Sequence, residues 1–191
     1  MATIISGDGT ITGLTSTGIS AAQTVTSVTS AALPAGTVLQ VASGYKTDAQ
    51  TISTNPPTFA DITGLSVTLT PRSSSSKFLC IWTVSAGNGL DASTCHIRLN
   101  RNGTAIALGD AASNRTTGSS IYINTSIGGE MLASSNTYLD SPATASAVTY
   151  KLTASTNTTN VTYINRSARD NDNIYYDGRV TSSITVLEIA G

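Results

Sequence analysis

Charged side chains are scarce in this chain of 191 residues, because Lys, Arg, Asp and Glu together make up 11% of it. Ordinary soluble domains carry about a quarter. The formal net charge is −1, and no stretch gathers Lys or Arg into the basic face that binding to nucleic acid requires. A charge-poor surface gains little electrostatic solubility and is safer inside an assembly. We therefore expect no nucleic-acid partner, and the composition favours a structural protein over a freely diffusing enzyme.

Long apolar segments and a cysteine framework are also missing. The opening MATIISGDGT has neither the basic stretch nor the apolar run of a secretory signal, and no run of about 18 apolar residues follows. We expect no insertion into a membrane. The two cysteines, Cys80 and Cys95, are too few for a disulfide scaffold. Buried free thiols are the expected state, and a bridge across a hairpin stays open if the strand register allows it.

The side chains that usually carry catalysis are few. His96 is the only histidine, which excludes a metal site built on two histidines, and no Gly-x-Ser-x-Gly motif accompanies it. Glycoside hydrolysis uses a pair of carboxylic acids, and Glu130 and Glu188 are the only glutamates. We expect no enzymatic activity and no cofactor. A polysaccharide-degrading spike that uses aspartates is the alternative of another class.

Small hydroxyl side chains are abundant, with 32 Thr and 26 Ser. Thr is β-branched and favours strands. From Gly36 to Gly191, short runs typical of strands alternate with Gly, Asn, Asp and Ser turns. SKFLCIWTVSAGNG is apolar on both faces, as in a strand covered on both sides, and TCHIRLNRNGTAIAL reads as a hairpin turning at Asn102-Gly103. This pattern predicts an all-β fold: a sandwich, a jelly roll or a barrel.

Residues 1–35 have a different character. They contain one charged residue, Asp8, and no aromatic side chain, so they lack the bulk to build a core. Such a segment can be ordered by pairing with other chains. We predict an extended N-terminal docking arm or stalk followed by a β head over residues 36–191. A flexible Ser/Thr-rich leader is the simpler alternative.

The last run, ITVLEIAG, is apolar on both sides, with Ile184 and Val186 on one face and Leu187 and Ile189 on the other. Such a strand is poorly suited to an exposed sheet edge. We expect it to be central in its sheet, with one face against another layer or another subunit. These four residues are the predicted subunit interface.

The stretch RDNDNIYYDGR contains three aspartates and two tyrosines. Alternating Asp and Asn can ring Ca²⁺, but an EF-hand needs Gly at its sixth place and Glu at its twelfth, where this chain has Tyr175 and Thr181. A solvated turn is the simplest interpretation. The two tyrosines could instead offer a shelf to a sugar ring, or pack at a subunit boundary, which we favour. The candidate surface-binding loop consists of Asp170, Asp172, Tyr175, Tyr176 and Asp177.

Several phrases resemble head domains of tail-fibre-like virion proteins from marine phages: ALPAGTVLQV, TFADITGLSVTLTPRSSSSKFL, RLNRNGTAIALGDAASNRTTGS and YYDGRVTSSITVLEIAG. The leader SGDGTITGLTSTGIS is similar to leaders of the same group. The resemblance implies an antiparallel jelly-roll-like sandwich, like tumour-necrosis-factor-like and complement-type heads, that assembles as a homotrimer with its closing strand near the threefold axis.

The same resemblance implies a place and partners for the protein. The chain would be made in the host cytoplasm and lie on the virion, at the capsid surface or tail, bound to capsid or tail proteins and to copies of itself. Its length suits a decoration protein, a head fibre or a short fibre subunit. Adhesion to a host-surface glycan or protein and capsid reinforcement both stay open, and a non-viral adhesion head is a further alternative.

Overall fold

The computed structural model describes residues 4–5, 11–12, 33–88, 93–124, 130–157, 161–172, 174–175 and 177–191. The chain divides into two compact units, Met1–Leu33 and Pro34–Gly191. In the first unit, β1 (Ile4–Ile5) and β2 (Ile11–Thr12) pair antiparallel. The arm predicted for residues 1–35 otherwise falls mostly outside the described residues. No helix that could cross a membrane occurs in the described part of the chain.

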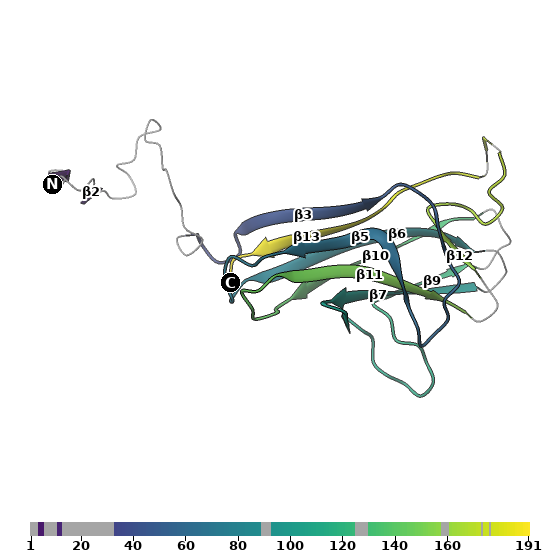
Figure 1. The fold of residues 1–191 in the computed structure, drawn as a ribbon, viewed down its shortest axis with the longest axis horizontal. Helices are drawn as coiled ribbons and strands as arrows, with labels where there is room; N and C mark the ends of the chain where they lie inside the picture. Colours follow the sequence, from purple (N-terminus) through teal and green to yellow (C-terminus); the bar gives the residue numbers. More distant parts are fainter. Residues whose placement is uncertain are drawn as a thin grey trace. The chain divides into compact units, whose positions relative to one another are not determined.

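The second unit consists of two antiparallel sheets, and β3 and β13 lie in one layer while β7 and β11 lie in the other (Figure 1). In the first sheet, β13 runs between β3 and β6, and β10 pairs with the other edge of β6. The strands of the first sheet are β3 (Val38–Lys46), β4 (Gln50–Ile52), β6 (Lys77–Asn88), β10 (Leu132–Asp140), β12 (Thr162–Ile164) and β13 (Ser182–Ile189). The strands of the second are β5 (Ala60–Leu69), β7 (Ser93–Arg101), β8 (Thr104–Ile106), β9 (Ser120–Asn124) and β11 (Val148–Thr156).

The connections give the sandwich its jelly-roll character. Along the chain, β3, β6, β10 and β13 of the first sheet alternate with β5, β7 and β11 of the second, so most connections cross between the layers. The prediction of an all-β, antiparallel, jelly-roll-like sandwich is confirmed. As predicted, the last strand is central in its sheet rather than at an edge.

The core forms where the alternating side chains of the two sheets face each other. In β6, Phe78, Cys80, Trp82 and Val84 all point inward and are buried. They meet inward side chains of the second sheet, for example in the contact between the Phe78 and Tyr150 rings, whose centroids are 5.7 Å apart. The inward members of the second sheet include Leu65, Val67, Ile97, Leu99, Leu152 and Ala154.

The predicted hairpin is present. β7 and β8 pair with Arg101 opposite Thr104, which leaves Asn102 and Gly103 as the turn. Their φ angles are 49° and 85°, the left-handed conformation at both central residues that a type I′ turn requires. Asn and Gly adopt this conformation at low cost, so the sequence sets the turn.

The second unit has two distinct ends. At the proximal end the chain enters beside its own C-terminus: the Gly36 N–H donates to the Ala190 carbonyl at 2.8 Å, and the Ala190 N–H donates to that of Thr37 at 2.8 Å. Since β13 begins at Ser182, opposite Lys46, the loop of residues 165–181 that precedes it lies at the distal end (Figure 1).

Candidate functional site

The predicted interface residues divide between the two faces of β13. Ile184 and Val186 are fully buried between the sheets and belong to the hydrophobic core. They already contact the chain's own second sheet, so they are not available to a neighbouring subunit, and the prediction must be corrected for these two residues. Leu187 and Ile189 are half-buried on the outer face of the first sheet. The interface hypothesis therefore rests on the outer pair.

Leu187 belongs to an apolar row that crosses four strands. The strand register places it between Val41 and Leu79, and Leu79 lies opposite Leu139. Val41 is 56% exposed and Leu139 is 51% exposed. Ile81, on the same face, is also exposed. We call the set Val41, Leu79, Ile81, Leu139 and Leu187 the apolar face.

The surroundings of the apolar face are polar and uncharged on the side towards the distal end, whereas the exposed Lys77, in register with Ile189, borders it on the proximal side. Hydroxyl side chains pair across the strands, Ser43 with Thr185 at 2.9 Å and Thr83 with Ser135 at 2.9 Å. Three successive cross-strand rows hold no charged side chain: Val41, Leu187, Leu79 and Leu139; then Ser43, Thr185, Ile81 and Thr137; then Tyr45, Ser183, Thr83 and Ser135. Burying such a surface against another chain leaves no charge without a partner.

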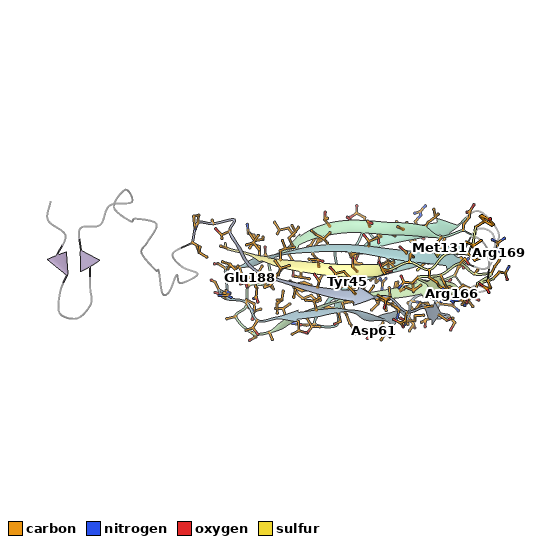
Figure 2. All side chains as sticks on the ribbon, turned by 90° about the horizontal axis from the view of Figure 1, so that it is seen from above. Tyr45, Asp61, Met131, Arg166, Arg169 and Glu188 are labelled. Atoms are coloured by element: carbon orange, nitrogen blue, oxygen red, sulfur yellow. The ribbon has the colours of Figure 1, made fainter. Side chains whose placement is uncertain are left out.

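The two glutamates lie far apart. Glu188 is fully buried towards the proximal end (Figure 2), where its carboxylate accepts from Gln40 Nε2 at 2.5 Å and from the Arg72 N–H at 2.6 Å. Glu188 is in register with Phe78, whereas Glu130 comes just before the strand end that pairs with Ala86. Eight residues of strand span roughly 26 Å. Glycosidase carboxyl groups lie about 5–10 Å apart, so these two cannot form such a pair.

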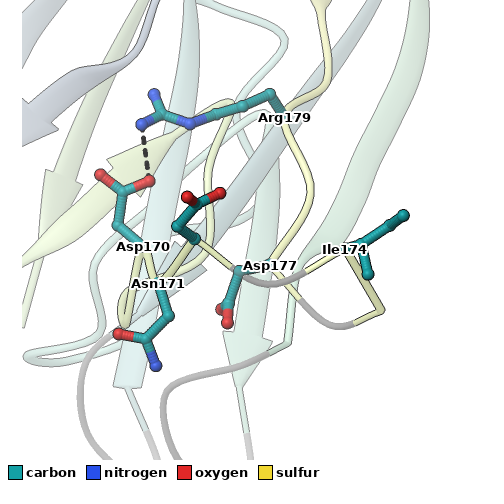
Figure 3. Close-up of a pocket in the computed structure, with 6 residues that line it drawn as sticks. Asp170, Asn171, Ile174, Asp177 and Arg179 are labelled. Carbon is teal, nitrogen blue, oxygen red and sulfur yellow. Dashed lines mark ion pairs between the residues drawn. The ribbon is translucent and has the colours of Figure 1, made fainter.

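The loop of residues 165–181 is held together by ion pairs. Arg179 Nη2 lies 2.6 Å from Asp170 Oδ1 (Figure 3), and Arg166 Nη1 lies 3.6 Å from Oδ2 of the same carboxylate. Asp177 accepts from Ser167 Oγ at 2.6 Å and lies 3.4 Å from Arg169. Asp170 and Asp177 are therefore neutralised by arginines instead of facing each other as free metal ligands. Among the described residues, no three His, Cys, Asp or Glu side chains gather closely enough to hold a metal ion.

The predicted surface-binding loop lies at the distal end, where Asp170, Asp172 and Asp177 line a hollow of about 460 Å³ (Figure 3). Ile174 also lines it and is 91% exposed, and Tyr175 is 82% exposed. Tyr176 lies outside the described residues. The ion pairs fix the loop's base, and the exposed Ile174 and Tyr175 offer apolar contacts to whatever meets this end.

The two cysteines lie in different sheets, and both thiols point into the core between the sheets. Cys80 on β6 and Cys95 on β7 are free and fully buried. Burial raises the pKa of each thiol to about 12. His96, the next residue, is half-buried on the outer face of the second sheet, where burial and the nearby Arg98 lower its pKa. Thiols protonated to this degree are unreactive at neutral pH.

The thiol pKa values predict a loss of stability in alkali. Unfolded thiols ionise near pH 9 while the native ones keep their protons up to about pH 12, so stability should fall across this window by up to about 1.4 kcal/mol per pH unit for each thiol. Urea unfolding at pH 7.5, 9 and 10.5 measures the fall. The double variant Cys80→Ala/Cys95→Ala should show a shallower dependence. If the free energy of unfolding of this variant depends on pH as it does in the wild type, the two buried thiols are not the cause of the fall.

Most of the apolar face was not singled out from the sequence. The signal was present in SKFLCIWTVS, whose outward side chains include Leu79 and Ile81, but alternation does not reveal which strands lie beside β13. Leu139 comes from β10, and its place next to Leu79 follows only from the sheet topology. A scan against models of known protein families and a search of curated protein sequences both find no match for this chain.

Proposed function

We propose that the protein is a non-enzymatic structural subunit of a phage particle, a homotrimeric fibre or decoration subunit with an outward-projecting β head. The observation that carries the proposal is the set of three uncharged cross-strand rows on the outer face of the first sheet, which contain the apolar face. Exposed contiguous apolar surface on a soluble domain marks an interaction site. In a protein with so few charged residues, the best-matched partner for this surface is another copy of itself.

The apolar face and the resemblance to trimeric heads together support the choice of a trimer. β6 is apolar on both faces, which is typical of a strand covered on both sides. Its inner side chains meet the second sheet, while on its outer side Leu79 is only half-buried and Ile81 is 39% exposed. Closed cyclic assembly of three copies would cover them without leaving an open edge for further growth.

The two ends of the second unit suit a projecting head. The chain enters at the proximal end, so an arm formed by residues 1–35 would leave from there towards a capsid or tail protein. The exposed Ile174 and Tyr175 lie at the distal end of the second unit, opposite the end at which the chain enters it. Their exposure favours adhesion to a host-surface glycan or protein over pure capsid reinforcement, which is the alternative role.

Removal of residues 1–35 should separate docking from folding. Among the described residues, the hydrophobic core cluster lies between Ala42 and Val186, so residues 36–191 should remain soluble, fold cooperatively and keep the oligomeric mass of the full chain. The truncated protein should be lost from particles, as measured by its amount in purified virions beside the full-length protein. A truncated protein that still joins particles would contradict the docking role. If the truncated protein aggregates, residues 1–35 are needed for folding of the second unit.

Locating the protein in the particle distinguishes the two structural roles. Electron microscopy of virions that carry a labelled copy should show the label at a fibre tip if the head is an adhesin. Label spread over the capsid lattice would favour the decoration role. If the label is found in neither place, the proposal that the protein is part of the virion is wrong.

A further inference from the structure

Arg98 is held in a fixed position on the outer face of the second sheet. Its guanidinium carbon lies 3.8 Å from the centre of the Phe59 ring. Its Nε donates to the Thr117 carbonyl at 2.9 Å, and Nη2 donates to Thr117 Oγ1 at 3.2 Å. Phe59 precedes β5 and Thr117 precedes β9, so two loops distant in sequence clamp one guanidinium. A group fixed in this way loses little further conformational freedom when it binds a ligand.

Arg98 has no carboxylate partner among the described residues. In contrast, Arg101, Arg166, Arg169 and Arg179 each lie within 4 Å of an aspartate. Burial lowers the pKa of Arg98, which means that its charged form is partly deprived of water. A partly buried cation is stabilised when an anion with matching hydrogen-bond geometry lies against it.

The guanidinium borders a crevice of about 320 Å³ between the two loops, a size that suits a small ligand. A second arginine, Arg115, lines it, and its lining contains neither Asp nor Glu. Hydroxyl and amide side chains of the lining supply hydrogen-bond donors and acceptors, and two prolines supply apolar surface. Besides Arg98, the crevice is lined by Pro56, Pro57, Ser113, Asn114, Arg115 and Thr116.

We infer that this crevice binds an acidic sugar, with Arg98 and Arg115 taking its carboxylate. A guanidinium matches a carboxylate through paired N–H donors, which a neutral sugar cannot use. The Ser113 and Thr116 hydroxyls and the Asn114 amide suit the ring hydroxyls of a sugar, which both donate and accept. If the head is an adhesin, an acidic sugar on the host surface would be its ligand, and to this extent the inference rests on the proposed function. The crevice lies on the second sheet, away from the apolar face, so a trimer formed through that face leaves it open.

Binding can be measured on the full-length protein with methyl β-D-glucuronide as the probe and methyl β-D-glucoside as its neutral match. Titration followed by NMR should show saturable binding of the glucuronide. The glucoside should bind at least about tenfold more weakly, because it lacks the carboxylate and so loses one charge-assisted hydrogen bond. Arg98→Lys keeps the charge but not the planar fork, and it should weaken glucuronide binding about tenfold. Arg115→Ala, in an exposed loop, should also weaken it without affecting folding.

Arg72→Ala is the matched control, because Arg72 is an exposed arginine outside the crevice, and binding should be unchanged. Equal binding of both sugars, or an unchanged affinity in Arg98→Lys and Arg115→Ala, would overturn the inference. Equal displacement by inorganic sulfate would overturn the sugar selectivity. The oligomeric mass of each variant is measured in parallel, so that a failed assembly and a failed sugar site are told apart.

Discussion

Replacing Val41 with Asp should dissociate the protein into folded monomers. Val41 is 56% exposed in the single chain, so the substitution places no charge in the chain's own core. In the proposed trimer it would bury three unpaired carboxylates, and an uncompensated buried charge costs on the order of 3–5 kcal/mol. We expect the dissociation constant to rise by at least about a hundredfold. Leu139→Asp, on a different strand of the same row, should act in the same way.

Ile121→Asp is the control for both variants. Ile121 is 50% exposed on β9, in the second sheet, so the same kind of substitution falls outside the apolar face. Light scattering should give the wild-type mass for Ile121→Asp and a monomer mass for Val41→Asp and Leu139→Asp. Circular dichroism confirms that all three remain β-folded. Wild-type mass in both apolar-face variants would show that subunits meet elsewhere.

Trp82→Ala should remove about 3–5 kcal/mol from the free energy of unfolding, since it leaves a large cavity between the sheets. Trp82 is 1% exposed, and its Nε1 donates to Ser120 Oγ at 3.4 Å across the sandwich. Trp82→Phe keeps most of the volume and should cost much less. Urea unfolding followed by circular dichroism at one fixed protein concentration measures both, because association shifts apparent stability.

The native fluorescence gives an independent check on the same residue. Trp82 is the only tryptophan, so the emission of the folded protein should be that of a buried indole and should shift to the red on unfolding. Emission typical of a solvated indole in the native state would contradict the position of β6 in the core.

Local sequence patterns were sufficient to predict the hairpin and the longer strands of the second unit, but not the short β4. Alternation in FLCIWTVS indicates Phe78 and Trp82 on one face whatever the partner strands are, and Asn102-Gly103 specifies its turn through backbone preference alone. The same alternation could not tell which face of β13 the chain's own second sheet covers. Ile184 and Leu187 are both apolar, and only the topology separates the core from the outer surface.

The loop and the crevice depend on contacts between distant residues. The alternating Asp and Asn of RDNDNIYYDGR left open whether the loop binds an ion, and the sequence does not reveal that Asp170 pairs with Arg179 nine positions later, after the chain has turned back. Arg98 likewise meets Phe59 and Thr117 only because two loops cross the second sheet. Pairing of this kind depends on loop conformation, which composition and periodicity do not specify.

The molar mass of the full-length protein in solution tests the central proposal, self-association through the apolar face, most directly. Size-exclusion chromatography with light scattering at micromolar concentration should give three times the chain mass of 19.5 kDa. A mass of 19.5 kDa under the same conditions would contradict the trimer.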